Sequence, residues 1–262
     1  MNDPYSAVLT RPRLVVGLGL GLLTALAWAY TVWLAVHMPM DGMTAGMAMA
    51  IPAPAPWDAA QSAFMFVMWT VMMVGMMVPS AAPMILVFHR IAADRGAKGQ
   101  AAVPTGVFLG GYLVVWTGFS AAATGAQWVL HDMALLSPMM AASSPLLGGA
   151  VLVAAGAFQL TPLKHACLKH CRSPMGFLLT QWREGARGAL AMGLRHGMYC
   201  TVCCWALMAL LFVGGVMNLL WVLALTLVVL GEKALPRGDL LGRLGGLALI
   251  AWGAWVALHG LA

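Results

Sequence analysis

Long apolar runs recur along the whole chain, separated by short segments that contain proline, glycine or charged residues. Runs of about 18 or more apolar residues indicate membrane-spanning helices. We expect seven such helices, at Leu14–Val36, Gln61–Phe88, Ala102–Leu130, Leu146–Leu163, Leu194–Val216, Leu219–Leu235 and Asp239–Leu261. Only Asn218 and Pro236–Arg237–Gly238 separate the last three, so a merged or re-entrant pair is an alternative there. The pattern predicts an all-α, polytopic transmembrane helix bundle that occupies residues 1–262 as a single domain.

The composition favours a membrane protein, because 62% of the residues are hydrophobic and only 8% are charged. A typical soluble domain has about 25% charged residues. The first apolar run follows a basic segment, as in a signal peptide, but it is longer than a signal-peptide core and lacks a small-residue cleavage site. We therefore expect it to remain as the first helix.

The charged residues predict which side of the membrane each loop faces. With the N-terminus in the cytoplasm, all 14 lysines and arginines fall in the N-terminal segment, in cytoplasmic connections or at their edges. The outer loops then carry Asp41, Asp58 and Asp132. Because basic residues are retained on the cytoplasmic side, we expect the N-terminus inside and the C-terminus outside. The net charge of +6 then reflects topology and attraction to anionic lipid, and it requires no nucleic-acid partner.

Glycines and prolines predict how the helices pack. Glycines recur at four-residue spacing in Gly17–Gly21, Gly106–Gly110 and Gly242–Gly246, which lets helix backbones approach closely in lipid. Pro79 and Pro83 are expected to bend or break the second helix, and such breaks often line a cavity.

Residues with metal-binding chemistry cluster in two neighbouring segments. Cys167 and Cys171 lie in the predicted cytoplasmic connection before the fifth helix, and the inner half of that helix contains Cys200, Cys203 and Cys204. A structural disulfide is not expected, because the cytoplasm keeps thiols reduced. Reduced buried cysteines are most often small packing residues, but five in two segments favour a binding site.

Helical spacing places several donors on common faces. If the connection is helical, Cys167 and Cys171 share one face, with His170 beside them. In the fifth helix, a stripe at four-residue intervals contains His196, Cys200, Cys204 and Met208. Thiolate and thioether ligands select soft ions, Cu(I) first, whereas thiolate with imidazole also suits Zn(II). Neither segment contains the two C-x2-C pairs of a zinc finger. Cu(I) is therefore the favoured metal, and zinc is the alternative.

Methionine supplies further soft donors. Of the 21 in the chain, six recur at short steps in the second predicted helix: Met65, Met68, Met72, Met73, Met76 and Met77. Such a stripe is more often packing than a site, but Met72 and Met76 are candidate ligands. At about 1.5 Å per residue, Met76 and Met77 lie at about the depth of Cys203 and Cys204. If the two helices are adjacent, they form a mixed Met/Cys site.

The first outer loop is a second methionine-rich segment. It contains five methionines and follows His37: Met38, Met40, Met43, Met47 and Met49. Thioethers remain ligands at any pH, whereas thiols must lose a proton first. The loop is therefore a candidate for capturing Cu(I).

The remaining polar residues of the helices point to structural roles. Glu232 is expected to pair with Lys233 or to extend to the membrane interface. Ser80 has no identifiable partner base. The chain has no glycine-rich phosphate-binding loop, hydrolase nucleophile elbow or H-E-x-x-H motif. An enzymatic activity is therefore not indicated.

Three segments carry family-like motifs. Residues 69–83 read W-x-x-M-M-x-x-M-M-x-P-S-x-x-P, residues 164–174 read K-x-x-C-x-x-x-C-R-x-P, and residues 197–208 read G-x-Y-C-x-x-C-C-W-x-L-M before Gly215–Asn218 and Glu232–Lys233. These motifs resemble those of a bacterial inner-membrane family of predicted metal-binding integral membrane proteins, a domain of unknown function. The resemblance covers about the second to sixth predicted helices. It implies a multi-pass bundle in the bacterial inner membrane with a metal site at the cysteines, and it implies no activity.

Three functions follow from these observations. The first is a transporter or membrane metallochaperone that binds and handles a soft transition metal, with copper favoured. The alternative is an accessory or assembly subunit of a membrane metalloenzyme complex, such as an oxidase or monooxygenase. A third hypothesis is a thiol redox enzyme that uses Cys200, Cys203 and Cys204. The expected partners are the lipid bilayer, a metal ion and, for the alternative, a membrane enzyme complex.

Overall fold

The computed structural model describes residues 12–37, 57–95, 102–137 and 140–260. Its helices are α2 (Pro12–His37), α3 (Ala59–Arg95), α4 (Ala102–Asp132), α5 (Pro145–Gln159), α6 (Pro162–Arg172), α7 (Pro174–Gln181), α8 (Gly185–Ala209), α9 (Leu211–Gly214), α10 (Leu219–Ala234) and α11 (Gly238–His259). These ranges contain no strand, and one isolated antiparallel bridge joins Leu136 and Ala142. The all-α class is confirmed for this part of the chain.

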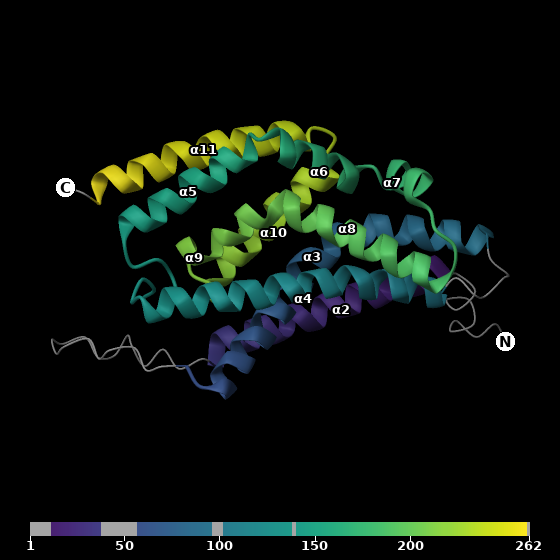
Figure 1. Ribbon diagram of the computed structural model, residues 1–262, viewed down its shortest axis with the longest axis horizontal. Coiled ribbons are helices and arrows are strands. Elements are labelled where there is room, and N and C mark those ends of the chain that lie inside the picture. The colour runs from purple at the N-terminus through teal and green to yellow at the C-terminus, as the bar shows by residue number, and fades with distance from the viewer. Residues whose placement is uncertain (1–11, 38–56, 96–101, 138–139, 261–262) are drawn as a thin grey trace, which may run out of the picture.

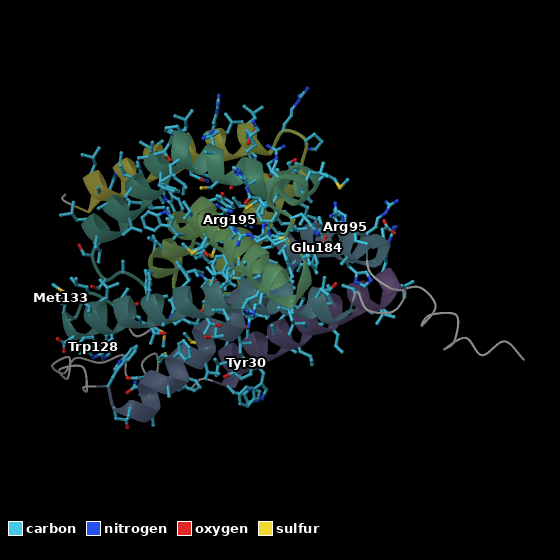
Figure 2. The ribbon with its side chains drawn as sticks, turned by 45° about the vertical axis from the view of Figure 1, so that its right-hand side comes forward. Tyr30, Arg95, Trp128, Met133, Glu184 and Arg195 are labelled. Atoms are coloured by element: carbon cyan, nitrogen blue, oxygen red, sulfur yellow. The ribbon has the colours of Figure 1, made fainter. Side chains whose placement is uncertain are left out.

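The long helices form three layers (Figure 1). Helices α2, α3 and α4 form the lower layer, α8 and α10 lie in the middle, and α5 packs against α11 in the upper layer. Helix α8 packs on α4, and α6 packs on the second half of α8, where Cys171 interacts with Cys200 and Cys203. Figure 2 shows the same order from another side. The centre of the bundle therefore lies between α3, α6, α8 and α10.

The apolar surface agrees with a multi-pass membrane protein. Five helices are long and apolar enough to cross a membrane, and a sixth span results if α5 and α6 count as one bent span. Helix α10 has 16 residues, which gives about 24 Å at 1.5 Å per residue, shorter than the roughly 30 Å hydrocarbon core. All seven predicted segments contain a helix, but seven crossings and their orientation remain predictions.

The fourth predicted segment, Leu146–Leu163, is wrong as a continuous helix. Helix α5 ends at Gln159, and α6 begins at Pro162 after a bend of 64°. Proline lacks the backbone N–H of a helix interior and disfavours helical geometry in the preceding residue. Thr161 caps the new helix by accepting a hydrogen bond from the Lys164 N–H at 3.3 Å. The connection predicted after Leu163 therefore contains two further helices, α6 and α7.

The last three predicted helices are separate helices in the structure. Of the three, only Leu194–Val216 has bounds that differ strongly from those observed. Helix α8 begins at Gly185 rather than Leu194, because arginines continue the helix beyond its apolar part. Gly215 then turns the chain at φ 92°, a conformation that favours glycine. Asn218 caps α10 by accepting a hydrogen bond from the Trp221 N–H at 3.3 Å.

Close glycine packing occurs mostly at positions that the four-residue motifs did not include. A Cβ added at Gly111 would lie 2.7 Å from the Leu190 carbonyl oxygen of α8, and one at Gly149 would lie 2.7 Å from the Gly253 carbonyl oxygen of α11. Nothing lies within 4 Å of such an atom at Gly17, Gly21, Gly106 or Gly110, whereas Gly246 does pack on Gly156. The prediction for the first two glycine pairs was wrong, because spacing does not say which face meets another helix.

Helix α3 continues through both prolines. Pro79 has no N–H for the carbonyl of Gly75, four residues earlier, and the Trp28 indole N–H of α2 donates to that oxygen at 3.2 Å. The expected break is therefore absent, because a neighbouring helix replaces the missing donor. The segment still borders the polar centre, since Ser80 lies between the prolines.

Candidate metal centre

Five cysteines from two helices lie together in the core. Cys200, Cys203 and Cys204 of α8 are at most 1% exposed, and Cys167 and Cys171 of α6 are 8% exposed. All five are free thiols. Helix α6 places its two cysteines on the face that packs against α8, as their four-residue spacing predicts.

The thiols interact across the α6–α8 interface. The Cys171 thiol interacts with Cys200 and Cys203, and Cys204 interacts with the same two residues. The Sγ atoms of Cys203 and Cys204 also donate to the Cys200 carbonyl oxygen, at 3.1 Å and 3.0 Å. Four sulfur atoms from two helices are thus brought within reach of one another.

Helix α3 adds a thioether to this cluster. The Sδ of Met77 lies 4.0 Å from the Sγ of Cys204. A metal–sulfur bond is about 2.3 Å for zinc, so two sulfurs on one such ion lie at most about 4.6 Å apart. The observed separation fits that limit. Met77 and Cys204 are thus neighbours, an adjacency that was assumed and not predicted from the sequence.

A buried lysine and a tyrosine contact Cys200. The Nζ of Lys233, from α10, lies 2.9 Å from the Cys200 Sγ and donates to the Ser80 Oγ at 2.9 Å. The Tyr112 hydroxyl of α4 lies 3.2 Å from the same sulfur and donates to the Met77 carbonyl oxygen at 3.1 Å. Within the described ranges no carboxylate pairs with Lys233. Cys200 therefore has hydrogen-bonding neighbours from two other helices.

Glu232 has a different partner from the predicted one. It accepts a hydrogen bond from Lys164 of α6 at 2.7 Å, and both side chains are at most 2% exposed. The Gln159 amide donates to the other carboxylate oxygen at 2.8 Å. Pairing with Lys233 was wrong, because adjacent helical residues point in different directions. The Ser80 partner that sequence reasoning did not identify is Lys233.

His196 lies one helical turn before Cys200 and is 2% exposed. Its ring packs among three aromatic rings, with centroids 5.6 Å from Tyr112, 5.7 Å from Phe177 and 6.1 Å from Phe108. Its Nδ1 is buried without a hydrogen-bond partner in the described part of the chain. A buried polar atom of this kind is costly unless a partner reaches it.

The other predicted site residues have other contacts or lie outside the described ranges. Met72, Met76 and Met208 are buried in the same core, and in the described residues none hydrogen-bonds to a thiol. His170 stacks on Tyr199 at 4.4 Å, and the His165 Nε2 accepts from the Arg243 Nε–H at 3.2 Å. His37 ends α2. The methionines from Met38 to Met49 lie outside the described residues.

The described residues contain no group of three or more His, Cys, Asp or Glu side chains arranged to hold a metal ion. Two thiols are turned toward a backbone carbonyl, so they must rotate to face a common ion. The donor chemistry nevertheless fits a soft ion, since thiols and a thioether adjoin one another. Met77 adds a thioether sulfur, a ligand that His, Cys, Asp and Glu do not provide.

Comparison with known proteins gives the family. No curated protein and no solved structure matches the chain. The family model PpoB2, described as copper chaperone, matches residues 66–256, which include the thiols, Met77 and Lys233 and leave out α2. This match covers well over half of the chain, so the chain belongs to the PpoB2 copper chaperone family.

Proposed function

We propose that this chain is a membrane copper chaperone that holds Cu(I) between α3, α6 and α8. The sulfur atoms of Cys171, Cys200, Cys203, Cys204 and Met77 are the proposed ligands. The observation that carries the proposal is a chain of buried sulfur contacts, in which Cys171 of α6 adjoins Cys200 and Cys203 of α8, and Cys204 of α8 adjoins Met77 of α3. The copper chaperone family of the chain supports the metal.

The donor set favours Cu(I) over Zn(II). Thiolate and thioether sulfur select Cu(I), whereas imidazole and carboxylate also suit harder ions. The only carboxylate in the neighbourhood described above, Glu232, is engaged by Lys164 and Gln159. Thiolates alone would also suit zinc, so the Met77 thioether beside Cys204 is the donor that favours Cu(I).

Lys233 has a defined role in this proposal. The thiolate, rather than the thiol, binds a metal, and a neighbouring cation stabilises the thiolate. The ammonium lies 2.9 Å from the Cys200 Sγ, and a buried cation itself needs an anionic partner. Lys233 is thus a positioning residue that stabilises the metal-binding thiolate form of Cys200.

A row of buried methionines leads from the thiols along α3. Met77, Met76, Met73, Met72, Met68 and Met65 are each at most 5% exposed. At the far end of the row, the Gln127 amide donates to the sulfurs of Met65 and Met140 at 3.8 Å and 3.1 Å. Because thioethers bind Cu(I) without a proton change, the row offers successive ligands for moving the ion between the two ends of the bundle.

Cu(I) titration under anaerobic, reducing conditions tests the proposal. The protein is purified in detergent and titrated against a Cu(I)-binding chelator, and bound copper is measured by elemental mass spectrometry. We expect the wild type to retain stoichiometric Cu(I) and a variant with Cys200, Cys203 and Cys204 changed to serine to lose it. Zn(II) titrated in parallel should bind more weakly.

Single-methionine variants locate the ion more closely. Met77→Leu removes the thioether beside Cys204 and should lower Cu(I) affinity about tenfold or more. Met198→Leu is the matched control, since Met198 lies on α8 with 54% of its surface exposed. Equal copper binding by the wild type and the triple serine variant would refute the site. An equal loss of Cu(I) affinity in Met77→Leu and Met198→Leu would show that Met77 is not a ligand.

A further inference from the structure

Two cavities lie at the junction of α6 and α11, and no cysteine lines either of them. One, of about 440 Å³, is lined by His165, Lys169, Arg172, Ser173 and Asp239. The other, of about 530 Å³, is lined by Leu160, Pro162, His165 and Arg243. His165 lines both cavities, so they adjoin each other between the two helices, and we call them together the basic recess.

The recess carries an excess of positive charge. Arg172 is engaged by Asp239 at 2.8 Å and by the carbonyl oxygens of Leu235 and Pro236. Lys169 is exposed and has no hydrogen bond or ion pair within the described ranges. Asp239 neutralises only one of the three basic side chains. The recess therefore retains positive charge that fits an anionic group.

The Arg243 side chain is held in place at the edge of the recess. The His165 Nδ1 donates to the Thr161 carbonyl oxygen at 2.8 Å, which leaves the His165 Nε2 to accept from the Arg243 Nε–H at 3.2 Å. The terminal NH2 groups of Arg243 have no partner in the described residues. A planar guanidinium held in this way presents paired donors for phosphate oxygens.

Exposed leucines surround the basic recess. Leu160 lines the larger cavity and is 39% exposed, Leu163 precedes Lys164 on α6, and Leu244 and Leu247 flank Arg243 on α11 with 56% exposure each. These apolar side chains continue onto the outer surface of α5 and α11. The surface thus combines cationic groups with an adjoining apolar face, as an amphiphile requires.

We propose that this recess binds the phosphate headgroup of an anionic phospholipid. Arg243 and Lys169 contact the phosphate, and an acyl chain lies along Leu160, Leu244 and Leu247. Basic pockets between helices at the cytoplasmic side of membranes bind anionic lipid headgroups in this manner. The site lies apart from the proposed copper ligands, so it can exist whether or not the chain binds copper.

Lipid retention measured by native mass spectrometry tests this inference. The detergent-purified protein is mixed with phosphatidylglycerol, with phosphatidylcholine, or with inorganic phosphate. We expect retention of phosphatidylglycerol that phosphatidylcholine and inorganic phosphate do not match. The double variant Lys169→Gln/Arg243→Gln should bind about 30-fold more weakly, at about 1 kcal/mol for each basic side chain and about 1.4 kcal/mol per tenfold change.

Matched variants separate a specific site from general charge attraction. Arg187→Gln also removes one exposed positive charge, near the start of α8, and should retain the lipid as the wild type does. Arg243→Lys keeps the charge without the planar fork and should bind between the wild type and the double variant. The proposal would be overturned if Arg187→Gln lost as much lipid as the double variant. Retention of inorganic phosphate equal to that of phosphatidylglycerol would also overturn it.

Discussion

At the scale of single residues, Cys200 connects the proposed copper ligands to the polar groups of the core. Its sulfur adjoins Lys233 and Tyr112, and its carbonyl oxygen accepts from the thiols of Cys203 and Cys204. A ligand shell becomes stiffer when surrounding groups fix its orientation. Changes to Lys233 or Tyr112 should therefore alter metal affinity without removing a ligand.

Tyr112→Phe removes one such neighbour. The hydroxyl bonds to the Cys200 sulfur and to the Met77 carbonyl oxygen, so the variant should bind Cu(I) about tenfold more weakly. Its stability should fall by about 1 kcal/mol. Chelator competition and thermal unfolding in detergent measure the two effects.

Tyr30→Phe provides the control for that change. Tyr30 lies on α2, far from α8 in Figure 2, and stacks on Trp33 at 6.3 Å. It should leave copper affinity unchanged. A loss of copper in Tyr30→Phe as large as in Tyr112→Phe would show that the hydroxyl of Tyr112 has no special role.

Residue identity and spacing predicted part of this centre. The spacing of the cysteines predicted which of them share a helix face, because this follows from helix geometry. The methionine that contacts Cys204 is Met77, whereas the methionines predicted as ligands in that helix were Met72 and Met76. Lys233 and Ser80 could not be paired from sequence, since their contact joins positions 153 residues apart. Tyr112 was missed for the same reason, because a lone tyrosine in an apolar helix carries no local signal.

At the scale of helices, the Lys164–Glu232 ion pair holds α6 and its two cysteines against α10. The pair is buried, and Gln159 of α5 bonds to the same carboxylate. Breaking one partner of a buried ion pair leaves an uncompensated charge. The position of α6 beside α8 is therefore tied to one carboxylate.

Glu232→Gln should destabilise the protein by about 3–5 kcal/mol, because Lys164 then remains buried without a counter-charge. The matched control is Glu184→Gln, which breaks the exposed Arg95–Glu184 pair labelled in Figure 2 and should cost less than about 1 kcal/mol. Thermal unfolding in detergent compares the two.

A double variant distinguishes the charge from the shape of the pair. Lys164→Met/Glu232→Leu replaces both charges with apolar groups and should recover most of the stability lost in Glu232→Gln. Equal stability of Glu232→Gln and Glu184→Gln would contradict the importance of the buried pair.

Helix bounds followed from the sequence where polar and proline signals were strong. The starts of α10 and α11 are predicted within one residue, because Asn218 and Pro236–Arg237–Gly238 interrupt the apolar run. The start of α8 was placed nine residues late, since a hydrophobicity criterion does not extend a helix over arginines such as Arg187. The α5–α6 bend depends on Pro162, whose effect hydrophobicity alone does not show.

At the scale of the whole molecule, basic residues of several described helix ends gather on one side. Helices α2, α8 and α11 begin, and α3 ends, toward the right of Figure 1, and these helix ends carry Arg13, Arg187, Arg243 and Arg95. Helix α4 ends at the opposite side with Asp132. This arrangement supports the predicted cytoplasmic location of the basic end.

If the chain crosses the membrane seven times, as predicted, its two termini lie on opposite sides. We expect alkaline phosphatase, which is active only outside the cytoplasm, to be active when fused after Ala262. The same reporter inserted after Gln181, between α7 and α8, should be inactive. Inactive enzyme at Ala262 would indicate an even number of crossings, with the short α10 as the first helix to reconsider.

The buried pair between α6 and α10 has a consequence for biogenesis. Lys164 leaves the ribosome 68 residues before Glu232, and a lone charge is expensive within a bilayer. Until α10 has been synthesised, we expect α6 to stay at the membrane surface, where its thiols are exposed to water. We therefore expect the sulfur cluster to form late in membrane insertion, after Glu232 has been synthesised and can pair with Lys164 of α6.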